Sequence, residues 1–161
     1  MKPLEIISHS SEETQKLGKI LGKLAEPADV YLLSGKLGAG KTCLTQGIAW
    51  GLDIEEYAAS PTFVLCREMS GRLSLYHIDL YRLDHLEEIA DLGLDDYFYN
   101  KGVSVVEWAE KGLNVLPDEN LQIQIEYVND TERKLTIIPH GKRYDKLLSN
   151  IISKTKGSTG N

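Results

Sequence analysis

Cysteine is scarce in this chain, and its two cysteines, Cys43 and Cys66, lie far apart in the sequence. Neither belongs to a Cys-x-x-Cys pair or to a cluster with histidine, so we expect no zinc site and no disulfide framework. Long apolar runs are also missing, because no stretch approaches the roughly 20 residues that a spanning helix needs. The first residues do not resemble a secretion signal. We therefore expect a cytoplasmic protein.

The chain also has fewer basic than acidic residues. The chain has 18 Lys and Arg against 24 Asp and Glu, a net charge of −6 and a pI near 5.2. Affinity for nucleic acid depends on neutralising phosphates, so this balance disfavours strong binding of nucleic acid by the chain alone. Hydrophobic residues at 42% and charged residues at 26% are typical of globular proteins. At 161 residues we expect one domain over 1–152 and a polar, disordered tail over 153–161.

Residues 35–42 read Gly-Lys-Leu-Gly-Ala-Gly-Lys-Thr, a complete G-x-x-x-x-G-K-[ST] pattern. An apolar run at 30–33 predicts a strand before it, and apolar residues at 44, 48, 49 and 52 predict a helix after it. Backbone N–H groups of such a loop, with the helix N-terminus, bind phosphate oxygens. Lys41 would place its charge on the terminal phosphates, and the Thr42 hydroxyl would face Mg²⁺. The expected triphosphate-binding residues are Gly35, Lys36, Leu37, Gly38, Ala39, Gly40, Lys41 and Thr42.

The rest of the pattern predicts an α/β fold. Ser10 as N-cap and Glu13 predict a helix over 10–24, and further helices are expected at 41–50, 84–90 and 144–151. Extended runs at 64–69 and 72–80, joined at 70–71, predict a hairpin, as do 121–127 and 134–138. A buried strand is expected at 103–107 and a short turn at 95–99. These elements predict a three-layer P-loop NTPase with a mixed, partly antiparallel central sheet flanked by helices.

Two carboxylates stand at the ends of apolar runs, where open α/β sheets bind their ligands. Asp79 could hold Mg²⁺ through its water shell, or cap a turn. Glu107 could orient water, act as a base or reach the metal, or lie on the surface. Trp108 either packs in the core or covers the nucleotide. Thr62, in Ser-Pro-Thr-Phe, either contacts the metal or phosphate as part of a switch-like segment, or belongs to a plain loop.

Two further absences narrow the function. Asn100-Lys101-Gly102-Val103 lacks the aspartate of the guanine-reading Asn-Lys-x-Asp motif, and no D-x-x-G follows Asp79, so ATP is the expected nucleotide. The chain has five arginines and no two are clustered as the lid that a small-molecule kinase needs. A partner-dependent ATPase is therefore favoured over such a kinase and over a nucleotide-sensing module that hydrolyses nothing.

Taken in order and spacing, several motifs resemble the TsaE family, which is also called YjeE. They are the loop at 35–42, Ser-Pro-Thr-Phe at 60–63, His-Ile-Asp-Leu-Tyr-Arg-Leu at 77–83, Leu-Gly-Leu at 92–94, Val-Glu-Trp at 106–108 and Leu-Pro at 116–117. The likeness covers about residues 5–140. It implies a bacterial ATPase that works with TsaB and TsaD to make the threonylcarbamoyl modification of the adenosine beside the anticodon, in tRNAs that read codons beginning with A.

The resemblance also implies roles for single residues. Lys41 and Thr42 would contact phosphate and Mg²⁺, and Asp79 and Glu107 would be the acidic pair. Thr62 would belong to the switch-like segment and Trp108 would lie near the nucleotide. Cys43 stands where a second hydroxyl residue often follows the family's loop, and its backbone N–H would still contact phosphate. The ATPase would support turnover of the TsaB–TsaD heterodimer, meet tRNA only through that complex, and leave the carbamoyl transfer to it.

Overall fold

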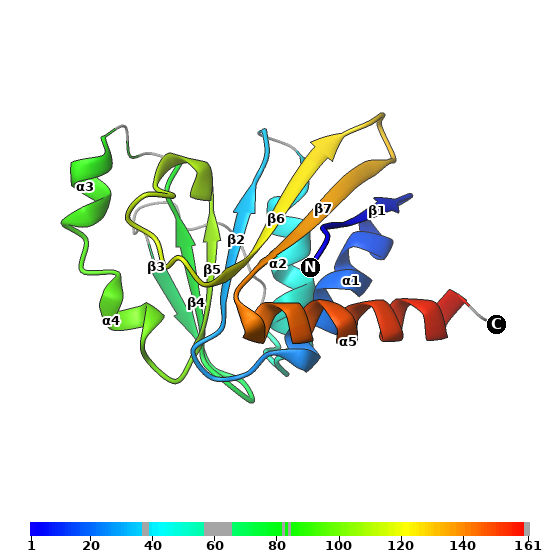
Figure 1. The fold of residues 1–161 in the computed structure, drawn as a ribbon, viewed down its shortest axis with the longest axis horizontal. Helices are drawn as coiled ribbons and strands as arrows, with labels where there is room; N and C mark the ends of the chain where they lie inside the picture. The colour runs from blue at the N-terminus through cyan, green and yellow to red at the C-terminus, as the bar shows by residue number, and fades with distance from the viewer. Residues whose placement is uncertain (37–38, 57–65, 82, 84, 160–161) are drawn as a thin grey trace.

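The computed structural model describes residues 1–36, 39–56, 66–81, 83 and 85–159. Its centre is a seven-stranded mixed sheet in the order β1-β7-β6-β2-β5-β4-β3 (Figure 1). The strands β2, β4, β5 and β6 run parallel to one another, and the hairpin pairs β3–β4 and β6–β7 are antiparallel. The strands are β1 (Leu4–Ser8), β2 (Val30–Ser34), β3 (Cys66–Met69), β4 (Leu75–Asp79), β5 (Val103–Glu107), β6 (Asn120–Tyr127) and β7 (Arg133–His140).

Helices cover both faces of this sheet, so the predicted three-layer fold is confirmed. One core packs α1, α2 and α5 against β2, β5, β6 and β7; the other packs α3, α4 and the 3₁₀ turn against the opposite face. Buried β2 supplies both cores, with Tyr31 and Leu33 on one face and Leu32 on the other. The helices are α1 (Ser11–Leu24), α2 (Lys41–Gly51), α3 (Leu86–Ala90), α4 (Asp95–Phe98) and α5 (Lys142–Thr159), with η1 at Ala109–Lys111.

Helices α1 and α2 lie unusually close because glycines line their contact. A Cβ at Gly18 would come within 2.4 Å of the Leu44 carbonyl oxygen, and one at Gly47 within 2.1 Å of the Gln15 oxygen. The start of α1 follows the sequence prediction in part: Ser10 Oγ accepts the Glu13 N–H at 3.1 Å. The Glu13 carboxylate, however, accepts the N–H of His9 rather than that of Ser10.

The first hairpin differs from its prediction. The sequence predicted a two-residue connection at 70–71 and a strand from 72, whereas β4 begins at Leu75. The backbone N–H of Arg72 donates to the Leu52 oxygen at 2.7 Å, and its guanidinium donates to the Gly22 oxygen at 2.8 Å. The turn is thus held by the ends of α1 and α2 rather than by strand pairing, which explains the longer loop.

Both ends of the chain also differ from expectation. Strand β1 was not predicted; it pairs antiparallel with β7 at the edge of the sheet. Helix α5 was expected to end at 151, with a disordered tail from 153, but it continues to Thr159. The hydroxyl of Thr155 donates to the Ile151 oxygen at 3.0 Å, as in a regular helix interior. Within the described part of the chain, no helix combines the length and the apolar character needed to cross a membrane.

Candidate functional site

The candidate site lies at the carboxyl edge of the parallel strands. Glu107, the last residue of β5, pairs with Leu33 of β2 on one side and with Asp79 of β4 on the other. The loop after β2 leads directly into α2, whose first residue is Lys41. Topology therefore brings the loop, Asp79 and Glu107 to one edge, as open α/β sheets do for their ligands.

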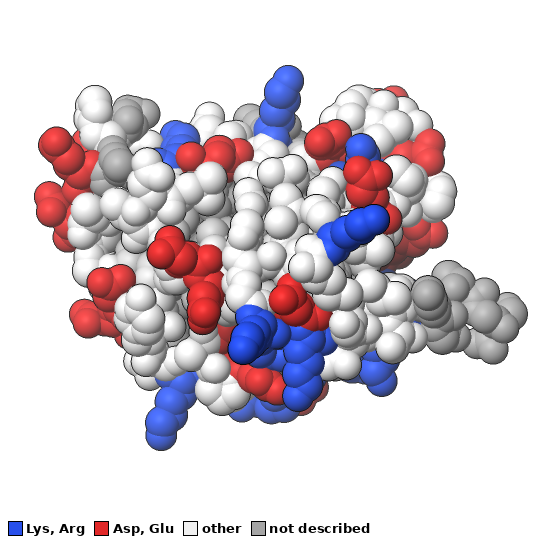
Figure 2. All heavy atoms as spheres, in the orientation of Figure 1, with Lys and Arg blue, Asp and Glu red and all other residues white. Residues whose placement is uncertain are grey.

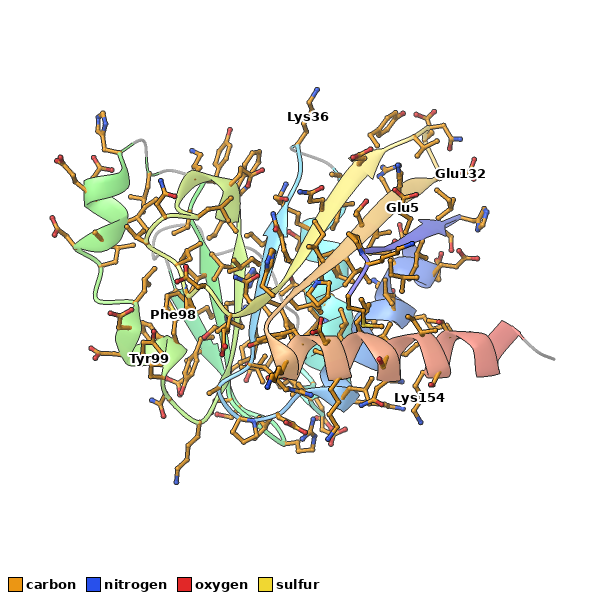
Figure 3. The ribbon with its side chains drawn as sticks, in the orientation of Figure 1. Glu5, Lys36, Phe98, Tyr99, Glu132 and Lys154 are labelled. Carbon is orange, nitrogen blue, oxygen red and sulfur yellow. The ribbon has the colours of Figure 1, made fainter. Side chains whose placement is uncertain are left out.

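The loop after β2 has the backbone that its glycines predict. Gly40 precedes α2 with φ of 112°, a left-handed conformation that residues with a side chain rarely adopt. Gly35 has no room for a side chain, because an added Cβ would lie 2.5 Å from the Ile125 carbonyl oxygen. Figure 3 shows Lys36 pointing away from the sheet at the end of β2. Leu37 and Gly38, two of the predicted loop residues, lie outside the described residues.

Lys41 is nearly buried, with 5% of its surface exposed. Its Nζ donates to the Gly35 oxygen and to the Lys36 oxygen, the latter at 3.0 Å, and lies 4.0 Å from the centre of the Trp108 ring. Burial lowers the pKa of Lys41, and the charges of Glu110, Glu107 and Asp79 oppose that shift. The Lys41 ammonium is thus bound by two loop carbonyls and lies close to three carboxylates.

Glu107 is 2% exposed and its two carboxylate oxygens face different partners. Oε1 lies 3.4 Å from the hydroxyl of Thr42. Oε2 contacts Nε2 of His77 and lies 3.4 Å from the hydroxyl of Thr45. Glu107 is therefore a buried acid joined to the start of α2, not a surface carboxylate.

Asp79 occupies the neighbouring strand end. Its Oδ1 accepts the backbone N–H of Tyr81 at 2.9 Å, the turn-capping contact considered from the sequence. Burial raises the pKa of this carboxyl; the Tyr81 N–H bond lowers it and the charge of Glu107 raises it further. Asp79 thus makes a turn contact through one oxygen while sharing the edge with Glu107.

Trp108 lies between the core and the loop. It is partly buried against the second core, and its ring stands 4.9 Å from the ring of Tyr81. Its backbone is left-handed, with φ of 59° and ψ of 37°, which is uncommon for a residue with a large side chain. With this backbone conformation, the indole lies beside Nζ of Lys41. Contact with a nucleotide stays a prediction.

Sequence reasoning gave no site role to three residues near the loop. Glu110 accepts the Gly35 N–H at 3.1 Å, and Arg133 donates to the Ala39 oxygen at 3.1 Å. His77 contacts Glu107 from within the sheet. Only tertiary contacts reveal Glu110 and Arg133, because they come from η1 and from the β6–β7 hairpin. For His77 the available signal was its place two residues before Asp79 on one strand.

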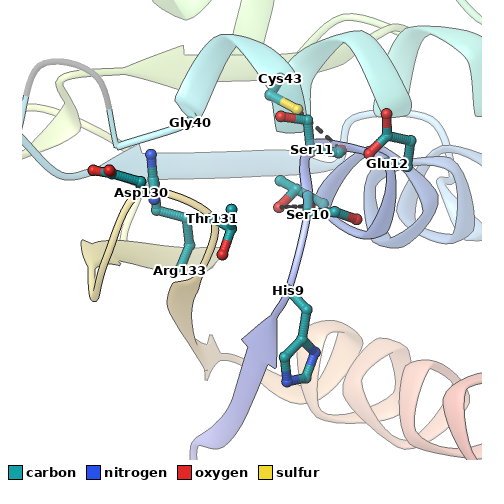
Figure 4. Close-up of a pocket in the computed structure, with 10 residues that line it drawn as sticks. His9, Ser10, Ser11, Glu12, Gly40, Cys43, Asp130, Thr131 and Arg133 are labelled. Atoms are coloured by element: carbon teal, nitrogen blue, oxygen red, sulfur yellow. Dashed lines mark hydrogen bonds between the residues drawn. The ribbon is translucent and has the colours of Figure 1, made fainter.

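A hollow of about 370 Å³ opens beside the start of α2 (Figure 4). Gly40 and Cys43 form one side, the start of α1 another, and the β6–β7 hairpin a third. Its polar lining includes Ser10, Thr131 and Arg133. Cys43 donates its thiol to the Ser11 oxygen at 3.3 Å, and burial raises its pKa. The hollow is thus continuous with the helix end of the loop.

Two further predictions concern the switch-like segment with Thr62 and the metal site. Thr62 lies outside the described residues. Among those residues, no group of three or more His, Cys, Asp and Glu side chains is arranged to hold a metal by itself. Mg²⁺ does not need such a group, since it keeps several waters and takes one or two carboxylates together with substrate phosphates. The side-chain oxygens of Thr42, Asp79 and Glu107 are ligands of the kind that such a Mg²⁺ site uses.

Comparison with known proteins assigns the chain to a family. Residues 8–135 match the model of the family described as threonylcarbamoyl adenosine biosynthesis protein TsaE. The chain is 45% identical over 148 residues to the tRNA threonylcarbamoyladenosine biosynthesis protein TsaE of Bacillus subtilis, covering 91% of this chain and 92% of that protein. It is 40% identical to the Treponema pallidum protein of the same name, over 83% of this chain and 99% of that one.

A solved structure agrees with these sequence matches. The crystal structure of Bacillus subtilis YdiB superimposes with a TM-score of 0.85 at 39% identity, covering 96% of this chain and 97% of that one. At this identity and coverage the likeness extends through the whole fold. The chain belongs to the TsaE family.

Proposed function

We propose that this protein binds and hydrolyses ATP in the service of tRNA threonylcarbamoyladenosine biosynthesis, as an accessory to a TsaB–TsaD heterodimer in the cytoplasm. Family membership supports the biosynthetic role. The observation that carries the ATPase role is the joint position of Lys41, Thr42 and Glu107 at one strand edge, behind a glycine-rich loop. The transfer of the threonylcarbamoyl group belongs to the partners.

Two neighbouring regions would bind the nucleotide, the loop its phosphates and the hollow its ribose and base. The phosphates would lie on the backbone N–H groups at the start of α2, where the helix terminus favours anions. Lys41 would exchange its carbonyl partners for phosphate oxygens. The hollow beside Gly40 and Cys43 would receive the ribose and base, with Ser10 and Arg133 among its polar groups. This division follows from Gly40, which ends the loop and also lines the hollow.

Thr42, Asp79 and Glu107 would hold Mg²⁺ together with the phosphates. The ion supplies charge neutralisation and orientation of the terminal phosphates when it is bound. Glu107 is buried, lies 3.4 Å from the Thr42 hydroxyl and contacts His77, and these contacts support a role for its carboxylate beside the metal or in orienting water. Asp79 would act from the adjacent strand.

The proposal is tested by hydrolysis with and without the partners. Wild-type protein, Lys41→Ala and Glu107→Gln are assayed for ATP binding and for phosphate release, each alone and with TsaB–TsaD. We expect slow release by wild type alone and faster release in the complex. Lys41→Ala should bind ATP at least about tenfold more weakly, because its charge meets the phosphates. Glu107→Gln should bind ATP and lose at least about 100-fold in hydrolysis rate.

Four results would contradict the proposal. Unchanged ATP affinity in Lys41→Ala would show that the loop at 35–42 does not bind the phosphates through Lys41. Wild-type hydrolysis by Glu107→Gln in the complex would remove the role of that carboxylate. Binding of ATP without turnover under any partner would make the protein a nucleotide sensor, and phosphate transfer to a small molecule would make it a kinase. Tyr99→Phe, a change at an exposed site just after α4 and far from the loop, serves as the matched control.

A further inference from the structure

His77 is a completely buried residue that has a single polar partner among the described residues. Its side chain is 0% exposed, and Nε2 contacts Oε2 of Glu107. The other ring nitrogen, Nδ1, is buried and has no hydrogen-bond partner in the part of the chain that the structure describes. A buried polar atom without a partner is costly, so its retention needs an explanation. The one interaction that explains it is the bond to Glu107.

The register of the sheet shows how His77 reaches Glu107. On β4, His77 stands opposite Val105 of β5, and Asp79 stands opposite Glu107. Side chains two residues apart share a face, so His77, Asp79, Val105 and Glu107 all lie on one face of the sheet. Val105 packs in the core that contains α2, so this is the face that carries the loop helix. His77 lies one step behind Glu107, on the side away from the strand end.

The bond polarity follows from the chemistry of the two groups. An ionised carboxylate only accepts hydrogen bonds, and beside such a carboxylate Nε2 of His77 is the donor. A neutral ring that donates through Nε2 leaves a bare lone pair on Nδ1. Among the described residues Nδ1 has no partner, and a buried acceptor without a partner costs less than a buried N–H without one. The tautomer with its proton on Nε2 is therefore favoured. The geometry is therefore that of a fixed donor aimed at one oxygen of Glu107.

We propose that His77 is a positioning residue for Glu107 in the Mg²⁺·ATP site, an inference that rests on the proposed function. His77, with the more distant hydroxyl of Thr45 at 3.4 Å, occupies Oε2. That leaves Oε1 directed at the Thr42 hydroxyl, 3.4 Å away at the start of α2. Without the histidine donor, Oε2 keeps only the 3.4 Å contact with Thr45, and the oxygen that would serve the metal and the water is oriented less firmly. Outer partners that orient metal-binding side chains commonly act in this way.

The test compares His77→Leu, which removes the donor, with His77→Gln, whose terminal amide keeps an N–H near the position of Nε2. Ser104→Ala on β5 is the control, because its buried hydroxyl has no partner among the described residues. ATP affinity in EDTA, the Mg²⁺ concentration that half-saturates hydrolysis, and kcat in the TsaB–TsaD complex are measured. His77→Leu should keep the EDTA affinity within about twofold and lose 10- to 100-fold in Mg²⁺ response or kcat. His77→Gln should recover most of that loss, and Ser104→Ala should match wild type.

Two outcomes of this comparison would overturn the inference. One is a folded His77→Leu protein with the Mg²⁺ response and kcat of wild type. The other is an equal loss in both variants that extends to ATP affinity in EDTA, as expected of a packing role. Failure of the wild type to bind ATP or to turn it over would instead count against the proposed function, so the two failures are distinguishable.

A measurement on the unaltered protein keeps the inference testable even when the variants do not fold. A long-range ¹H–¹⁵N correlation spectrum of the histidine rings, with His77 assigned, reports which nitrogen carries a proton. A proton on Nε2 supports the donor role. An Nε2 without a proton overturns it, because the ring would then have nothing to donate to Glu107.

Discussion

Lys41 carries its charge at the centre of a small electrostatic network. Loop carbonyls, the Trp108 ring and three nearby carboxylates all stabilise the ammonium, whereas burial disfavours it. These partners come from the loop after β2, from the ends of β4 and β5, and from η1. A ligand phosphate that attracts Lys41 must therefore alter its contact with Trp108.

This arrangement predicts a fluorescence signal for nucleotide binding. Trp108 should report ATP because the cation over its ring moves, whereas Trp50, on α2 with 39% of its surface exposed, should not. Emission is titrated with ATP in wild type, Trp50→Phe and Trp108→Phe. The change should persist in Trp50→Phe and disappear in Trp108→Phe. The reverse pattern would show that Lys41 and Trp108 are not coupled in this way.

At the scale of elements, the packing of α1 on α2 supports the loop. Glycines on both helices let the two backbones approach so closely that a single methyl group has no room. The first turn of α2 carries Lys41 and Thr42, so the position of that helix sets the position of the loop. The stability of this contact is therefore also a condition for the site.

We expect Gly47→Ala to destabilise the fold by about 3 kcal/mol, because the new Cβ would lie 2.1 Å from the Gln15 carbonyl oxygen. The gain of alanine over glycine in helix propensity, about 1 kcal/mol, offsets little of this. Urea unfolding followed by circular dichroism measures the change. Lys16→Ala, an exposed site on α1, should change stability by less than about 0.5 kcal/mol. Equal stability of Gly47→Ala and wild type would refute the close approach.

Helix α5 is joined to the central strand through Tyr144, whose hydroxyl accepts the Val30 N–H at 2.8 Å. Burial raises the pKa of Tyr144 to about 12 from an ordinary value of 10. Between these values the folded state keeps a proton that the unfolded state releases. The free energy of unfolding therefore falls as pH rises through this window.

Tyr144→Phe should cost about 1–3 kcal/mol at pH 7, because the buried Val30 N–H loses its partner. Between pH 10 and 12 its stability should also decline less steeply than that of wild type. Urea unfolding at pH 7 and at several values from 10 to 12 measures both effects. Tyr99→Phe, with the hydroxyl lost from a side chain that is 76% exposed, should behave as wild type. Parallel pH profiles for Tyr144→Phe and wild type would contradict the assignment.

Across the whole molecule, acidic side chains outnumber basic ones, and some are grouped. Figure 2 shows red side chains along the left edge, over α3 and α4, where Glu87, Glu88, Asp91, Asp95 and Asp96 are exposed. On the face shown, several basic side chains gather at the lower edge beside acidic ones, and the other basic side chains stand singly. A surface of this kind repels a polyanion over a distance set by the salt concentration.

We therefore expect the isolated protein not to bind tRNA. In a gel mobility assay at physiological salt, no shift should appear up to about 10 µM protein, and a shift should require the TsaB–TsaD partners. Lowering the salt should not produce binding, because few counterions would be released. Salt-sensitive binding of tRNA by the chain alone would show that the partners are not the intermediaries.

Much of this site was predictable because it depends on local sequence. The loop at 35–42 and the strand ends at Asp79 and Glu107 follow from short patterns whose backbone requirements are set by glycines and by apolar periodicity. The hairpin at 70–74 and strand β1 were less predictable. Their backbone is paired with residues distant in sequence, Leu52 in one case and β7 in the other.

The sequence by itself determined the fold class, the glycine-rich loop after β2 and the carboxylates at the sheet edge, because each follows from short local patterns of residues. Tertiary structure alone decided that Glu110 and Arg133 bond to the loop, that Trp108 lies over Lys41, and that His77 lies behind Glu107. These contacts join residues 30 to 94 positions apart. They depend on strand order and register, which are set by packing of the complete sheet and its helices.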